Sequence, residues 1–203
     1  MPEHPSKRSA VLRWVERLGL AAALSCATWV AFVTVEGVAF ERDARRDMET
    51  APAPDADPPV TVRHGALIAL LDIPRLGFSE IVAEGDSDDV LRVAIGHLPD
   101  TPLPWQPGRS AVAGHRDGHF RPLKDIRAGD TILLRMPHGT LTYVVESTAI
   151  VLPSDLTVLT PTRDRYLTLI TCYPFSFIGR APQRFVVHAR GLDLTQAPRP
   201  ARP

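Results

Sequence analysis

The chain begins with one long apolar segment. Residues 18–35 contain no charged side chain, while charged residues crowd both flanks. A helix needs about 20 apolar residues to cross a bilayer, so this run with its flanks is long enough to do so. No polar stripe marks a solvent-facing side, which argues against a helix that packs onto a soluble core. We therefore predict a transmembrane helix over residues 18–40.

The charges on the two sides of this segment predict its orientation. Three basic residues follow it closely, and four precede it: Lys7, Arg8, Arg13 and Arg17. Because cytoplasmic flanks are enriched in lysine and arginine, we expect residues 1–17 to be cytoplasmic and the rest to be exported. A cleaved signal peptide is the alternative, with a small-residue cleavage site at residues 37–39. The apolar run exceeds the usual signal-peptide core of about 7–15 residues, which favours an uncleaved anchor.

After residue 65 the pattern changes to short β-like runs separated by turns. These runs are apolar or alternate between apolar and polar positions: residues 66–73, 79–83, 110–114, 131–136, 140–145, 165–171 and 184–190. Residues 131–136 and 140–145 predict a hairpin through residues 137–139. Short helical turns are expected at residues 86–93 and 120–126. Many short strands and few helices are typical of a closed or nearly closed antiparallel barrel or sandwich, and the missing long helices disfavour a parallel α/β sheet.

The rest of the chain divides around this β-rich region. Residues 41–64 are charged and then rich in alanine, proline and aspartate, which predicts a flexible linker. Residues 65–194 form the predicted folded domain, whose size is ordinary for a single domain. Residues 195–203 are predicted to be a disordered tail.

Charge and cysteine content narrow the chemistry. Lysine plus arginine and aspartate plus glutamate number 23 each, so the net charge is zero and a nucleic-acid partner is disfavoured. The two cysteines are Cys26, inside the apolar segment, and Cys172, in the predicted domain. These positions place them in different parts of the protein, so we expect no disulfide between them. An unpaired thiol in an exported domain requires a functional explanation.

Cys172 stands where a reactive thiol can be presented. It directly follows the strand predicted over residues 165–171 and precedes Tyr173 and Pro174. Proline interrupts strand pairing. A cysteine at a strand end projects from the rim of a sheet and is a candidate nucleophile. From this local context alone, a packed structural cysteine remains an equal alternative.

His115 follows a small-residue strand at a comparable rim. A histidine in this place is a candidate acid or base near neutral pH, and a plain surface histidine is the alternative. A metal site formed by His115, His119 and Cys172 is disfavoured. Gly114 and Gly118 predict a turn rather than the helix that would align the two histidines, and no fourth ligand is evident.

Arg184 begins the last predicted strand. If that strand pairs antiparallel with residues 165–171, Arg184 returns to the rim that carries Cys172. A guanidinium there can stabilise the oxyanion of a tetrahedral intermediate. Arg180, on the intervening loop, is the rival for this role, and a solvated strand-edge arginine is the plainer alternative.

Three separated motifs resemble those of the sortase family. Residues 168–172 read TLITC, which matches the Thr-Leu-x-Thr-Cys signature, residues 113–117 (AGHRD) look like the catalytic-histidine segment, and residues 184–187 (RFVV) look like the arginine strand. Order and spacing agree from about residue 66 to residue 189. Residues 173–177 and the arginine, alanine and proline content are similar to the sortases of Gram-negative proteobacteria.

The resemblance implies a mainly β fold: a closed, eight-stranded sortase-type barrel with short helices behind one transmembrane signal anchor. It implies a cysteine transpeptidase, single-pass in the inner (cytoplasmic) membrane, with its catalytic domain on the periplasmic or extracytoplasmic side. Cys172 would cleave an LPxTG-like C-terminal sorting motif of an exported protein as a thioester and pass it to an amine acceptor. His115 would protonate the leaving amine and Arg184 would stabilise the oxyanion and substrate. No metal or organic cofactor is implied.

Two other functions remain open. A thiol hydrolase or protease would use the same site with water as the acceptor, and a non-catalytic membrane-tethered binding barrel would keep only the fold. The acidic residues Asp86, Asp88 and Asp89 are assigned to the start of a helix, with Asp86 or Ser87 as its cap, rather than to a calcium site.

Overall fold

The structure is a computed structural model, and it describes residues 7–50, 61–136, 139–176 and 179–192. The chain divides into two compact units, Met1–Arg42 and Asp43–Pro203, and each is described by itself.

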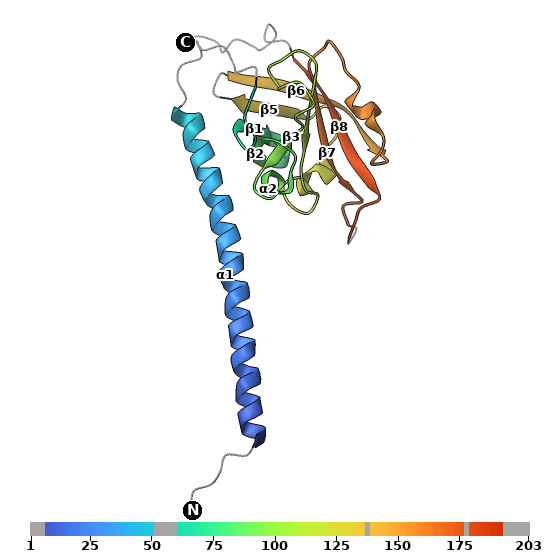
Figure 1. Ribbon diagram of the computed structural model, residues 1–203. Helices are drawn as coiled ribbons and strands as arrows, with labels where there is room; N and C mark the ends of the chain where they lie inside the picture. Colours follow the sequence, from blue (N-terminus) through green and yellow to red (C-terminus); the bar gives the residue numbers. More distant parts are fainter. Residues whose placement is uncertain (1–6, 51–60, 137–138, 177–178, 193–203) are drawn as a thin grey trace, which may run out of the picture. The chain divides into compact units, whose positions relative to one another are not determined.

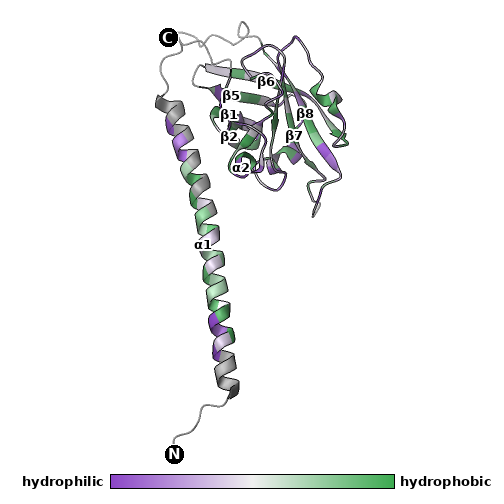
Figure 2. Cartoon of the chain, in the orientation of Figure 1, coloured by the Kyte–Doolittle hydropathy of each residue, from purple (hydrophilic) through white to green (hydrophobic). Residues whose placement is uncertain are grey.

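The described part of the first unit lies within the long helix α1 (Lys7–Thr50), which continues past the unit's end at Arg42 (Figure 1). Its segment Arg13–Phe32 is long and apolar enough to cross a membrane, and none of that segment is buried in the protein. Figure 2 shows the apolar positions gathered in the middle of the helix, with hydrophilic positions toward both ends. A hydrocarbon layer about 30 Å thick accommodates such a surface, whereas water does not. The predicted apolar helix is thus present.

Helix α1 extends further than the sequence analysis predicted. It ends at Thr50, so residues 41–50 are helical, although they were assigned to a flexible linker. These ten residues include glutamate, arginine, alanine and methionine, which favour helix, and they include neither glycine nor proline. An ion pair between Arg46 and Asp43 (3.7 Å) adds support at helical spacing. The predicted linker residues 51–60 and the predicted tail lie outside the described residues.

The second unit is a closed barrel of eight β-strands (Figure 1). In chain order the strands are β1 (Leu67–Ile73), β2 (Phe78–Glu84), β3 (Ile95–His97), β4 (Arg109–Ala113), β5 (Thr131–Met136), β6 (Gly139–Val151), β7 (Tyr166–Tyr173) and β8 (Gln183–Gly191). Around the barrel the order is β1-β2-β3-β4-β7-β8-β6-β5, and β5 pairs with β1 to close it. The predicted closed eight-stranded barrel is confirmed.

Two neighbouring pairs of strands run parallel, which the expectation of an antiparallel barrel missed. These pairs are β2 with β3 and β4 with β7. The first is possible because the connection between its strands contains the short helix α2 (Asp88–Leu91), and the second because β5 and β6 intervene along the chain. The other short helices described are η1 (Pro74–Leu76), η2 (Arg121–Asp125) and η3 (Leu156–Leu159). Ser87 occupies the N-cap position of α2, but its side chain makes no capping hydrogen bond.

Side-chain alternation separates an inner face of the barrel from an outer face. Leu167 and Leu169 of β7, and Val187 and Ala189 of β8, are fully buried in the core. Successive side chains of a strand point to opposite faces, so the even-numbered positions of both strands lie on the outer face, where Thr168 and Val186 are covered but Cys172 and Arg184 are partly exposed. This parity decides which residues at the ends of β7 and β8 can meet a substrate.

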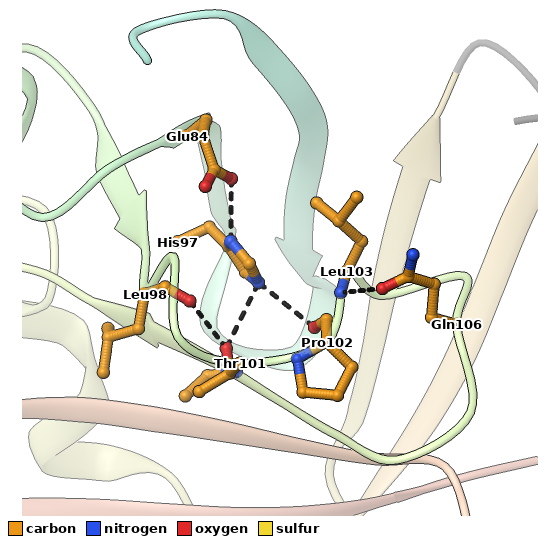
Figure 3. Close-up of polar contacts among 8 residues, drawn as sticks. Glu84, His97, Leu98, Thr101, Pro102, Leu103 and Gln106 are labelled. Atoms are coloured by element: carbon orange, nitrogen blue, oxygen red, sulfur yellow. Dashed lines mark hydrogen bonds and ion pairs between the residues drawn. The ribbon is translucent and has the colours of Figure 1, made fainter. Parts of the chain in front are cut away.

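A buried polar network secures the proline-rich turn that follows β3 (Figure 3). The ring of His97 lies with Nδ1 2.8 Å from the carboxylate of Glu84 and with Nε2 3.1 Å from the carbonyl oxygen of Pro102. The hydroxyl of Thr101 donates its hydrogen to the carbonyl of Leu98, so it offers only a lone pair to Nε2. Nε2 of His97 therefore carries a hydrogen and donates it, which ties the turn to the barrel wall.

Candidate active site

Cys172 lies on the outer face of β7. The strand continues through it to Tyr173, so the thiol is carried by the penultimate strand residue rather than by the residue after the strand. Its parity is opposite to that of the core residues Leu167 and Leu169, and it is partly exposed. Cys26 and Cys172 are both free thiols, and each lies in a different unit. Cys172 is thus placed as an accessible thiol and not as a core filler.

Arg184 stands directly opposite Cys172 on the neighbouring strand. β7 and β8 pair antiparallel, with Cys172 aligned to Arg184 and Tyr173 to Gln183. Directly opposed residues have Cβ atoms about 4.5–5.5 Å apart and share one face of the sheet. The strand pairing expected from the sequence is confirmed. Arg180 is exposed and lies in the loop before β8, where no strand fixes its backbone.

His115 emerges from the adjoining strand on the other side of β7. Strands β4 and β7 are parallel, and their ladder continues past Ala113: the N–H of Gly114 donates to the carbonyl of Ile170 (3.2 Å). The hydroxyl of Thr171 then donates to the carbonyl of Gly114 (2.7 Å). His115 follows Gly114 as Cys172 follows Thr171, so the exposed histidine begins its loop alongside the thiol.

Gly114 is required by its contact with a buried ring. A Cβ atom at this position would lie 2.7 Å from the Cδ2 atom of Phe120, which is fully buried. The N–H of Phe120 donates to the carbonyl of His115 (3.0 Å) and closes the turn. The small residue before the histidine therefore lets the loop fold back tightly onto the barrel.

Arg116 and Asp117 are site residues to which the sequence analysis assigned no role. Arg116 is buried, 6% exposed, and its Nε and Nη2 atoms donate to the two carboxylate oxygens of Asp117 at 3.1 and 2.6 Å. Its Nη1 atom donates to the carbonyl of Pro174 (2.9 Å), two residues after Cys172. The hydrogen bond to Arg116 is the main cause that lowers the pKa of Asp117, and the same bond raises the pKa of Arg116. The sequence signal was the Arg-Asp dipeptide inside AGHRD.

The alternative of a metal site finds no ligand set in the described part of the chain. Nδ1 of His119 lies 2.8 Å from the carboxylate of Glu80 on β2. Within the described ranges, no group of three or more histidine, cysteine, aspartate or glutamate side chains is arranged to hold a metal ion. The structure does not bring His119 together with His115 and Cys172 as ligands.

Apolar and aromatic side chains border the Cys172 end of β7 and β8. Tyr173, Phe175 and Phe185 pack together, with ring centroids 5.2–6.3 Å apart. At the end of β6, Val151 pairs with Arg184, and large exposed apolar residues lie just before and after it: Ile150, Leu152 and Leu156. Exposed apolar residues next to reactive groups are typical of a surface that binds an apolar ligand segment.

A cavity of about 340 Å³ lies at the opposite end of β7. It is lined by Pro107, Arg163, Asp164, Arg165, Arg190 and Gly191, which adjoin the first residues of β7 and the last of β8. Strand β7 separates this cavity from Cys172 by roughly 20 Å, at about 3.3 Å per residue. It plays no part in the arrangement around the thiol.

Comparisons with known proteins agree with this geometry. Residues 71–191 match the sortase domain family. Over 127 residues the chain is 33% identical to Sortase D of Bacillus subtilis, and the match covers 62% of this chain and 64% of that protein, slightly less than two thirds of its length.

Solved structures show the same fold. A Sortase D5 transpeptidase of Clostridium perfringens superposes with a TM-score of 0.60 at 26% identity, over 75% of this chain and 89% of that one. A mutant of sortase E from Streptomyces avermitilis superposes with a TM-score of 0.55 at 32% identity, over 65% and 91%. The family match covers more than half of the chain, including the strands that carry Cys172 and Arg184 and the loop that carries His115. The chain therefore belongs to the sortase family.

Proposed function

We propose that this protein is a cysteine transpeptidase that cuts an exported protein within a C-terminal sorting motif and joins it to an amine. The observation that carries the proposal is the alignment of Cys172 with Arg184 on the outer face of β7 and β8, beside the loop that begins with His115. Nucleophile, cation and proton carrier thus come from three adjacent strand ends. The C. perfringens relative is described as a transpeptidase, which supports the same assignment here.

Each of the three residues has a defined part in the proposed reaction. The Cys172 sulfur, as thiolate, attacks the scissile carbonyl carbon, and Arg184 stabilises the oxygen that gains negative charge. Protonated His115 gives its proton to the leaving amine, the C–N bond breaks, and a thioester remains on Cys172. An incoming amine attacks the thioester and loses a proton to His115. The new amide bond forms and the thiolate leaves, which restores the starting state.

The substrate class follows from the family and from the surface near the site. We assign an LPxTG-like sorting motif as the substrate, because the family implies it and because Leu152 and Leu156, just beyond the pairing of Val151 with Arg184, are exposed apolar side chains. The acceptor is a primary amine, supplied by a wall peptide or by a pilin lysine. Water as the acceptor would make the same site a thiol hydrolase.

The proposed location is a bilayer crossed once by α1. In this proposal residues 1–17 are cytoplasmic, residues 18–40 cross the inner membrane, and the catalytic domain, residues 65–194, lies on the periplasmic or extracytoplasmic side. The apolar length of Arg13–Phe32 supports the span. The similarity to sortases of Gram-negative proteobacteria rests on residues 173–177 and composition, and the relatives above, from Bacillus, Clostridium and Streptomyces, lend it no support.

A peptide screen on the full chain in detergent tests the proposal. The protein is incubated with a panel of LPxTG-like peptides and a primary amine, and products are identified by mass. We expect an amine-joined peptide that is absent with Cys172→Ala. Cleaved peptide without amine incorporation would favour the hydrolase, and intact peptides throughout the panel would favour the non-catalytic binding barrel.

A further inference from the structure

Arg116 is a buried cation between two exposed residues of the loop after β4. Its neighbours His115 and Asp117 are exposed, whereas the guanidinium turns inward and is 6% exposed. Removing a guanidinium from water is unfavourable unless hydrogen bonds and an opposite charge replace the lost hydration. Asp117 supplies both through a two-oxygen contact, and the carbonyl of Pro174 supplies a third acceptor. Because burying this loop arginine costs free energy of desolvation, its inward orientation is expected to serve a role in the structure or the reaction.

The carbonyl of Pro174, which accepts a hydrogen bond from Arg116, shows which two segments the guanidinium joins. Pro174 is two residues beyond Cys172 and 58 residues from Arg116 along the chain. A second link, from the Thr171 hydroxyl to the carbonyl of Gly114 (2.7 Å), joins the residues just before Cys172 and just before His115. The two reactive residues are therefore each enclosed between cross-links, one on either side.

We propose that Arg116 is a positioning residue: it joins the loop of His115 to the segment that follows Cys172 and so holds the two side chains at one spacing. The inference rests on the proposed function, in which this pair performs acyl transfer. Arginine suits the task because its planar fork holds the carboxylate with two donors and leaves a third for Pro174. Lysine has the charge but not this geometry.

The same guanidinium brings a positive charge close to the thiol. The hydrogen bond to Asp117 is the largest cause that raises the pKa of Arg116, and the charge of Cys172 contributes further. By the same attraction, Arg116 stabilises negative charge on the sulfur. Among the described residues, other titratable or charged groups on the elements beside the thiol are His115 and Asp117 on the same loop, Tyr173 on β7 and Arg184 on β8. Arg116 thus acts on Cys172 through both geometry and charge.

Two substitutions separate geometry from charge. Arg116→Gln removes the cation and the fork, whereas Arg116→Lys keeps a cation and removes the fork. Both are made in the full chain with Cys26→Ala, so that Cys172 is its sole thiol, and Arg121→Gln is the matched control because Arg121 is an exposed arginine of the adjoining helix η2. The measurements are amine-joined product formation, the rate of Cys172 alkylation by iodoacetamide at a fixed pH, and thermal unfolding.

We expect Arg116→Gln to lower product formation by about 10–100-fold, since a misplacement of about 1 Å can cost that much. It should also slow the alkylation of Cys172 at a fixed pH, because a cation that attracts negative charge on the sulfur is lost. Arg116→Lys should keep the parent's alkylation rate but still lose about 10-fold in product formation. Arg121→Gln should match the parent in both assays. If the loss of any positive charge lowered activity, Arg121→Gln would lose activity as well.

Product formation at the parent's rate by folded Arg116→Gln would overturn the inference, as would an equal loss in Arg121→Gln. If Arg116→Gln does not fold, Asp117→Asn replaces it. This change keeps an exposed side chain but weakens the fork, and an unchanged rate would again overturn the inference. If the parent itself joins no peptide to an amine, the proposed function fails. Slower alkylation of Cys172 in folded Arg116→Gln would still support the influence of Arg116 on the thiol, and an unchanged rate would contradict it.

Discussion

At His97 both ring nitrogens face oxygen atoms that accept hydrogen bonds. Nε2 faces the Pro102 carbonyl and the Thr101 hydroxyl, whose own hydrogen goes to Leu98, and Nδ1 faces the Glu84 carboxylate, while the ring itself is 1% exposed. In the sequence, this histidine precedes a proline-rich turn and shows no sign of burial. Its partner Glu84 is 13 residues away and becomes adjacent only through the parallel pairing of β2 with β3. Sequence patterns cannot reveal a polar contact that depends on such pairing.

Substitutions at the two ends of this contact should differ in cost. His97→Phe leaves the Glu84 carboxylate buried without its partner, so we expect a loss of about 3–5 kcal/mol in the free energy of unfolding. Glu84→Gln should cost only about 1 kcal/mol, because an amide N–H can donate to Nδ1 while Nε2 keeps its bond to Pro102. Urea unfolding of the full chain in detergent measures both. Equal losses would contradict the assigned hydrogen-bond pattern.

The inward orientation of the Arg116 side chain is a second feature that the sequence could not reveal. The AGHRD motif identified His115, and the adjoining arginine and aspartate were visible with it. Nothing in the sequence indicates that one of two charged neighbours turns into the protein. That fact follows from the carbonyl of Pro174, which a distant segment supplies.

Strand elements were predictable where side chains alternate or form long apolar runs. β1, β2, β4, β5, β7 and β8 fall within about two residues of their predicted ranges, and β5 and β6 form the expected hairpin. β3 was missed because it is three residues long, too short for a period to show. β6 runs to Val151, six residues beyond its predicted end. Its second half pairs with β8 but does not alternate regularly between buried and exposed positions, so the sequence pattern did not reveal it. The predicted turn residues Pro137 and His138 lie outside the described residues.

The register of β7 against β8 predicts which arginine stabilises the oxyanion. Arg184 is aligned with Cys172 inside a strand pair, and Arg180 is on the loop. We expect Arg184→Ala to lower product formation by about 100-fold, as loss of an oxyanion donor does, with little change in the unfolding midpoint. Arg180→Ala is the control and should stay within about threefold of the parent, because an exposed loop arginine contributes little to positioning.

Steady-state kinetics with a fixed peptide and amine give these rates, and thermal unfolding shows whether each variant remains folded. A loss in Arg180→Ala as large as that in Arg184→Ala would move the oxyanion role to the loop. A matching fall in the unfolding midpoint of Arg184→Ala would indicate a structural role instead.

The whole chain joins an apolar helix to a closed β-barrel. The sequence predicted both parts, since an uncharged run and short β-like runs are strong patterns. It did not predict that the helix continues to Thr50, because the absence of apolar periodicity after residue 40 was interpreted as a linker. A charged segment without helix breakers remains helical when it extends an existing helix, since elongation avoids the cost of nucleation.

Thiol labelling tests the proposed topology of the whole molecule. In spheroplasts of expressing cells, a membrane-impermeant maleimide should label Cys172, which is partly exposed on the barrel, and should not label Cys172→Ala, since Cys26 lies within the apolar span. Labelling only after lysis would place the barrel in the cytoplasm. The mass of the purified chain distinguishes an anchor from a cleaved leader, because cleavage after residue 39 would remove the whole apolar span.

The fate of the acyl-enzyme tests the central claim most directly. Full-length protein is loaded with a substrate peptide in the absence of amine, freed of excess peptide, and divided between buffer with and without a primary amine. Intact mass should show an acyl adduct on Cys172 that decays faster with amine and yields the amine-joined peptide. Decay at one rate in both buffers, with hydrolysed peptide as the sole product, would contradict transpeptidation, and an adduct that persists in Cys172→Ala would contradict Cys172 as the nucleophile.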